Sequence, residues 1–107
     1  MKGRRFPRVI CADGFNMSVQ AHDRAYCSPR EDNAENYKEV EVGFPSAEEP
    51  LLMEYCEEPD YPTGTIYAYV PVGVVTNVIA KHGGMVDGDT PPGVAKLRAS
   101  ELSLIHI

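Results

Sequence analysis

The stretch TIYAYVPVGVVTNVIAKHGG, residues 65–84, decides the fold, because it joins the clearest strand pattern in the chain to its clearest helix pattern. Over residues 65–70 apolar and polar side chains alternate, which predicts a strand with a core face and an open face. The predicted core face carries Ile66, Ala68 and Val70. The predicted open face carries Thr65, Tyr67 and Tyr69. After Pro71 the spacing predicts a helix that ends at Gly83-Gly84. Its apolar stripe consists of Val74, Val75, Val78, Ile79 and His82.

The segments around this unit are typical of short strands. Apolar or alternating runs predict strands over residues 6–12, 16–21, 24–28 and 37–44. In the last of these, the core-facing residues are predicted to be Val40, Val42 and Phe44. Residues 47–55 fit a short helix or a strand, and the chain from Met85 onward is predicted to be loop and tail. Because strands and helices do not alternate, we predict an α+β fold, an antiparallel sheet of four to five strands with one amphipathic helix packed on it.

The chain has 107 residues, the length of one domain, which we place at residues 1–99. Its last six residues, LSLIHI (Leu102–Ile107), match the translation of the end sequence of a transposase adapter used to prepare sequencing libraries. We therefore interpret residues 100–107 as a non-native tail and leave His106 out of every site.

Charge is distributed unevenly along the chain, whose net charge is −6. Residues 31–60 contain eleven acidic residues and a single basic one, Lys38, whereas the N-terminal arm is basic. An acidic run is most often a solvated face. It also suits a surface that competes with nucleic acid for a basic protein groove. The basic arm, which carries Lys2, Arg4, Arg5 and Arg8, suits a patch for a phosphate-bearing ligand. All three interpretations stay open.

Targeting and cysteine patterns favour a cytoplasmic protein. No apolar run approaches the length of a membrane span, and the basic start of the chain is too short for a secretory signal. The three cysteines Cys11, Cys27 and Cys56 are odd in number and widely spaced, which favours reduced thiols over disulfides or a zinc site.

No motif predicts catalysis, a metal site or a cofactor. Ser18, His22 and Asp23 include the residue types of a catalytic triad, but no Gly-x-Ser-x-Gly turn accompanies them. Possible metal ligands are present without the spacing of a known site: His22, Asp23, His82, Asp87 and Asp89. The pairs Glu48-Glu49 and Glu57-Glu58 are predicted to be solvated loop residues. We therefore expect a protein that is not an enzyme and holds no cofactor or metal.

Polar and aromatic side chains outside the predicted core are the strongest indication of function. Tyrosine and arginine are enriched in recognition surfaces, where they stack on rings and grip phosphates or carboxylates. Arg30 follows Pro29 at a predicted strand end, a fixed place to hold such an anion. The candidate ligand-binding residues are Ser18, Gln20, Tyr26, Ser28, Arg30, Tyr67 and Tyr69. The competing interpretation is that strand-face tyrosines are structural and border the core.

Several short motifs resemble a set of small accessory proteins of tailed bacteriophages to which no activity is assigned. The motifs are Ser18–Ala21 (SVQA), Tyr26–Arg30 (YCSPR), Val40–Ser46 (VEVGFPS), Tyr69–Pro71 (YVP) and Val78–Gly84 (VIAKHGG), and the resemblance covers most of residues 6–84. It implies a phage origin and residence in the cytoplasm of an infected bacterium. Small phage proteins without catalytic motifs often act against host defence, by capturing a nucleotide signal or by blocking a defence protein.

Two functions follow as expectations. The first is a counter-defence protein that binds and sequesters a small nucleotide-type immune signal without catalysing a reaction, and that does not bind nucleic acid or membrane directly. We expect it to be a homo-oligomer, because subunit interfaces can enclose a ligand that a small monomer cannot. The second is an acidic, anti-CRISPR-like mimic of nucleic acid that inhibits a basic host defence protein. Its acidic surface would consist of Glu48, Glu49, Glu57 and Glu58.

Overall fold

The computed structural model describes residues 4–100, so the expected tail beyond Ser100 lies outside the described residues. Five strands form one antiparallel sheet in the order β4-β3-β2-β1-β5, as predicted in fold class. The strands are β1 (Val9–Cys11), β2 (Asn16–Gln20), β3 (Glu39–Gly43), β4 (Ile66–Pro71) and β5 (Met85–Asp87). The helix α1 (Val72–Lys81) and the 3-10 helix η1 (Pro50–Tyr55) complete the described elements.

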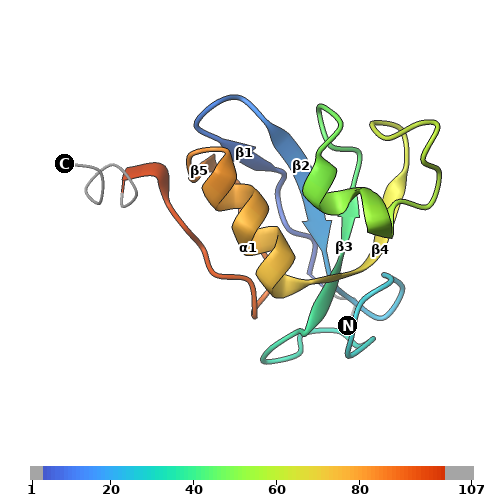
Figure 1. Ribbon diagram of the computed structural model, residues 1–107. Coiled ribbons are helices and arrows are strands. Elements are labelled where there is room, and N and C mark those ends of the chain that lie inside the picture. Colours follow the sequence, from blue (N-terminus) through green and yellow to red (C-terminus); the bar gives the residue numbers. More distant parts are fainter. Residues whose placement is uncertain (1–3, 101–107) are drawn as a thin grey trace.

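The core lies between the sheet and these two helices, which cover the same face (Figure 1). The alternation of β2 buries Met17 and Val19 completely and leaves its polar residues half-buried on the other face. From α1, the residues that close the core are Val75, Val78 and Ile79, three members of the predicted stripe. The opposite face of the sheet carries no helix of the described chain, and the polar strand residues gather there.

The helix ends where two glycines allow a left-handed backbone. Gly83 and Gly84 have φ angles of 90° and 87°, and the amide of Gly84 donates to the carbonyl of Ile79. The chain then reverses into β5, which pairs with β1 through Cys11 and Met85. The prediction that the chain is loop and tail from Met85 onward is therefore wrong for Met85–Asp87, which form a strand. A three-residue strand with only Met85 buried lacks the alternation that marks longer strands.

A β-bulge reverses the predicted faces in the first half of β4 and leaves Tyr69 and Val70 on the faces predicted for them. Val40 pairs with Val70 and Val42 pairs with Tyr67, so Glu41 alone opposes two residues, Ala68 and Tyr69. One extra residue shifts the alternation by one position. Tyr67 is consequently fully buried beside Val70 in the core, and the prediction that it faces away from the core is wrong. Tyr69 has a φ of 52° and stays on the surface, as predicted.

Two other strand predictions differ from the structure. Residues 24–28 form turns and contribute one isolated bridge, Ser28 to Glu39, instead of a strand. Phe44, expected in the core, follows the end of β3 with a φ of 49° and is 50 % exposed. Because the chain turns left-handed there, Phe44 points outward and Pro45 is buried in its place.

Candidate ligand-binding groove

A groove of about 470 Å³ lies on the helix-free face of the sheet. Its floor consists of outward residues of β2, β3 and β4, because alternate side chains of neighbouring strands share one face. One end is apolar, at Phe44 and Ile66, and the other end is charged. The lining residues are Arg5, Ser18, Gln20, His22, Arg24, Glu41, Gly43, Phe44 and Ile66. A volume of this size suits a small organic ligand.

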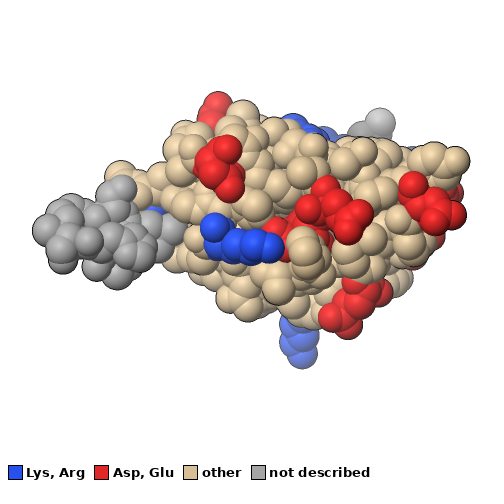
Figure 2. All heavy atoms as spheres, turned by 45° about the horizontal axis from the view of Figure 1, so that its top comes forward, with Lys and Arg blue, Asp and Glu red and all other residues tan. Residues whose placement is uncertain are grey.

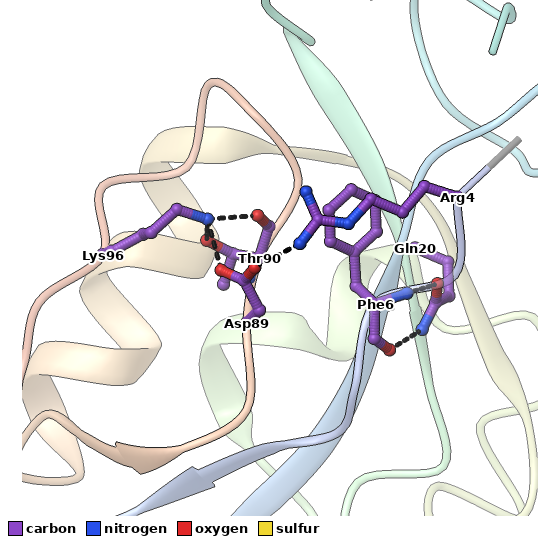
Figure 3. A network of polar contacts seen from close by, with 6 residues as sticks. All are labelled: Arg4, Phe6, Gln20, Asp89, Thr90 and Lys96. Carbon is purple, nitrogen blue, oxygen red and sulfur yellow. Dashed lines mark hydrogen bonds and ion pairs between the residues drawn. The ribbon is translucent and has the colours of Figure 1, made fainter. Parts of the chain in front are cut away.

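Gln20 fixes the N-terminal segment beside the groove. Its side-chain oxygen accepts from the amide of Phe6 at 2.9 Å and its nitrogen donates to the carbonyl of Phe6 at 2.7 Å (Figure 3). The same nitrogen donates to Ser18 Oγ at 3.0 Å. The side-chain amide of Gln20 thus acts as one more peptide group in the sheet. Its role here is to position the segment, and Ser18 accepts from it without using its own hydroxyl proton.

The two arginines that precede Phe6 have different partners. Arg4 forms an ion pair of 2.7 Å with Asp89, which Lys96 also binds at 2.5 Å (Figure 3). The Arg4 guanidinium also lies 4.6 Å from the centre of the Phe6 ring. Arg5, in contrast, lines the groove and contacts His22. The segment is therefore held to the Asp89 loop by one arginine and presents the other to the groove.

The charged end of the groove has more hydrogen-bond donors than acceptors. Arg5 Nη1 contacts Nε2 of His22, and the amide of Arg24 donates to Nδ1 of the same ring at 3.1 Å. Both approaching groups are donors, whereas a neutral imidazole offers one lone pair. Burial and the charge of Arg5 lower the pKa of His22, which keeps the ring neutral. Within residues 4–100, neither Arg5 nor Arg24 forms an ion pair with a carboxylate.

His22 also belongs to a group that could hold a metal ion. Ligand atoms of His22, Asp23 and Asp32 lie within 4.8 Å of one another. Both ring nitrogens of His22 already face N–H groups, however, so a cation would have to displace Arg5 or the amide of Arg24. The arrangement therefore favours an anion at Arg5 over a cation at His22.

Three of the predicted site residues form a second cluster. The rings of Tyr26 and Tyr69 lie 6.0 Å apart, and the Arg30 guanidinium lies 5.3 Å from the centre of the Tyr26 ring. The amide of Tyr69 donates to the carbonyl of Tyr26 and joins the two segments. Neither tyrosine lines the groove, but Tyr69 lies in the bulge of β4 opposite Glu41, which does line it.

The predicted site is therefore divided. Ser18 and Gln20 line the groove, Tyr26, Arg30 and Tyr69 form the neighbouring cluster, and Ser28 is half-buried where it bridges to Glu39. Tyr67 cannot contact a surface ligand, because its ring is buried and its hydroxyl donates to the carbonyl of Pro62 at 2.6 Å. Sequence reasoning gave Arg5 only as part of the basic arm, as one residue of a possible phosphate-binding patch, and it missed Arg24 and Glu41. The alternation of β3 already directed Glu41 outward, whereas nothing local placed the two arginines beside it.

Glu49 is not a solvated loop residue, contrary to the prediction. Its side chain is 1 % exposed, and its Oε2 accepts from the amide of Leu51 at 2.8 Å and from Lys81 Nζ at 2.9 Å. Its Oε1 accepts from Nε2 of His82 at 2.7 Å, while Nδ1 of that ring bonds Asp13 at 2.6 Å. A ring that bonds a carboxylate through each nitrogen is an imidazolium. Burial lowers the pKa of His82, but these bonds outweigh it and raise the pKa.

The face drawn in Figure 2 carries no continuous acidic surface. Acidic side chains there lie in separate groups divided by uncharged surface, and a basic side chain lies between two of these groups. Glu48, Glu57 and Glu58 are exposed and have no ion pair within the described chain. The acidic surface expected for a nucleic-acid mimic therefore keeps Glu48, Glu57 and Glu58 and loses Glu49, which is buried.

The fold and the groove define a small α+β protein with a polar sheet-face site. Comparison with protein-family models, with curated proteins and with solved structures found no match. Across residues 4–100, no helix has the length and apolar character required to cross a membrane.

Proposed function

We propose that the protein is a non-catalytic binding protein that sequesters a small nucleotide-type signal in the sheet-face groove. It would be made by a phage and would act against the defence system of the bacterial host. The observation that carries this proposal is the pair Arg5 and Arg24, which face the groove without a carboxylate partner among residues 4–100. Guanidinium groups bind phosphate through forked, charge-assisted hydrogen bonds. These two arginines take the role that the sequence suggested for Arg30.

Aromatic and polar groups around the arginines support a nucleotide over a simple anion. The Ser18 hydroxyl lies on the groove floor, and the apolar end at Phe44 and Ile66 offers a surface for a base. Tyr69 and Tyr26 provide exposed rings on the adjoining side, where stacking on any base is favourable. The groove is open to solvent, so we propose that a second copy of the chain encloses the ligand in a symmetric oligomer.

Titration calorimetry with AMP, GMP, cyclic AMP and cyclic ADP-ribose tests the proposal. We expect at least one of these probes to bind, and Arg5→Ala and Arg24→Ala each to weaken its affinity by about tenfold, because each removes a charge-assisted hydrogen bond. Lys38→Ala is the matched control, since it removes an exposed positive charge outside the groove and should leave the affinity unchanged. Absence of both heat and thermal shift with every probe would refute the proposal. Native mass spectrometry of the same samples reports the number of subunits.

The second proposal is an acidic inhibitor of a basic defence protein, supported by the exposed carboxylates of Glu48, Glu57 and Glu58, which form no ion pair among residues 4–100. Replacing all three with lysine should abolish inhibition of DNA cleavage by a CRISPR nuclease, because the attraction becomes repulsion. The inhibition by the wild-type protein should also weaken as salt is raised. Glu35→Lys reverses an exposed charge elsewhere and is the control. Full inhibition by the triple variant contradicts this second function.

A further inference from the structure

Among residues 4–100, Glu41 is the one acidic residue that lines the groove, and no residue of that range forms an ion pair with its carboxylate. It lies at the centre of β3, opposite Gln20 on β2 and opposite the bulge of β4. Its side chain is half-buried. This acceptor therefore lines the groove and is only partly accessible to solvent.

The neighbours of Glu41 cannot satisfy it. Both ends of the Gln20 amide are occupied by Phe6 and Ser18. His22 is held neutral because burial and Arg5 lower its pKa, although the charge of Glu41 acts in the opposite direction. Arg5 and Arg24 share the groove with Glu41, yet neither lies within 4.0 Å of its oxygens. The space between the carboxylate and the two guanidinium groups is therefore part of the groove.

A carboxylate only accepts hydrogen bonds, and its two oxygens suit a pair of adjacent donors. An anion without donors, placed on Arg5 and Arg24, would be repelled by Glu41. A ligand that carries both an anionic group and a donor pair would satisfy all three side chains. The charges of the groove thus select a composite ligand.

On the basis of the proposed function, we infer that Glu41 determines ligand specificity by accepting two adjacent O–H or N–H donors of a nucleotide whose phosphate lies on Arg5 and Arg24. Two parts of a nucleotide have this chemistry. One is the 2′,3′-diol of ribose, and the other is the edge of guanine that carries N1–H and the 2-amino group. A nucleotide that lacks both is a poor ligand.

The test compares Glu41→Gln with wild type by titration calorimetry, using AMP, GMP and inorganic pyrophosphate as probes. Glutamine keeps the size of the side chain but replaces one acceptor with a donor. We expect Glu41→Gln to weaken the tighter-binding nucleotide by about tenfold, the loss of a hydrogen bond to a charged group. Pyrophosphate carries no pair of adjacent donors for Glu41, so its affinity should stay equal or rise. Glu39→Gln, two residues away on the same strand and outside the groove, should change neither.

Two pairs of probes distinguish the sources of the donors. A weaker affinity for 2′-deoxy-AMP than for AMP identifies the ribose diol. A weaker affinity for IMP than for GMP identifies the guanine edge, because IMP lacks the 2-amino group. If Glu41→Gln binds nucleotides and pyrophosphate equally well or more tightly than wild type, Glu41 only repels anions and the inference is wrong. Binding of pyrophosphate but of no nucleotide also overturns it and leaves the anion groove intact, whereas binding of no probe at all removes the proposed function.

Discussion

Replacing Glu49 with alanine is expected to lower the free energy of unfolding by about 3 kcal/mol, the cost of breaking a buried ion pair from one side. The loss has three parts. The amide of Leu51 loses its cap at the start of η1, and Lys81 and His82 lose their shared acceptor. Because Glu49 connects η1 to the end of α1, both core-forming helices lose a contact. Urea denaturation measures the change.

Glu48→Ala is the matched control for this prediction. Glu48 is the preceding residue but is exposed, so its removal should change stability by no more than about 0.5 kcal/mol. Equal losses in the two variants would mean that Glu49 is solvated, as the sequence alone predicts.

The same network gives the stability a defined dependence on pH. Burial raises the pKa of Glu49, but bonds from Leu51, His82 and Lys81 outweigh it and lower the pKa. Its stabilising contribution is therefore present above the ordinary carboxyl range and is lost as the pH falls through the folded-state value. The raised pKa of His82 has the opposite effect. Its contribution is complete below the ordinary histidine value of 6.5 and is lost as the pH rises through the folded-state value. Glu49→Gln removes one of the two carboxylates that bind His82, so its stability should fall less than that of the wild type as the pH rises above 6.5. If the stability of Glu49→Gln fell as steeply as that of the wild type, the network would be contradicted.

Tyr67→Ala should destabilise the fold by about 3 kcal/mol or more, as truncation of a large buried aromatic does. The ring is fully buried in the core, and its hydroxyl donates to the carbonyl of Pro62 at 2.6 Å. Tyr69→Ala, two residues along the same strand, removes a ring that is 43 % exposed and contacts Tyr26. Its loss should cost about 1 kcal/mol or less.

The two tyrosine variants together test the bulge. An unbroken alternation would place both rings on one face, and the two variants would then lose similar stability. The bulge predicts unequal losses in chemical denaturation. Similar losses of stability in the two variants would therefore contradict the bulge.

The candidate site was predictable in part. Ser18 and Gln20 alternate with buried Met17 and Val19, and that local pattern correctly placed them on the open face of β2. Arg5 belongs to a basic arm with no periodicity, so its place beside His22 depends on Gln20 binding Phe6 from fourteen residues away. Glu49 looked like one of a pair of loop carboxylates, because its partners Lys81 and His82 lie more than thirty residues further along the chain.

Periodicity along the chain determined the class of fold, the helix with its buried Val75, Val78 and Ile79, and the turn at Gly83 and Gly84, because each depends on residues within a few positions of one another. Only the tertiary structure decided which tyrosine of β4 is buried, which carboxylate is buried and which arginines share a groove. Each of these depends on a register or a contact between distant segments, and a single extra residue in one strand is enough to exchange the two faces.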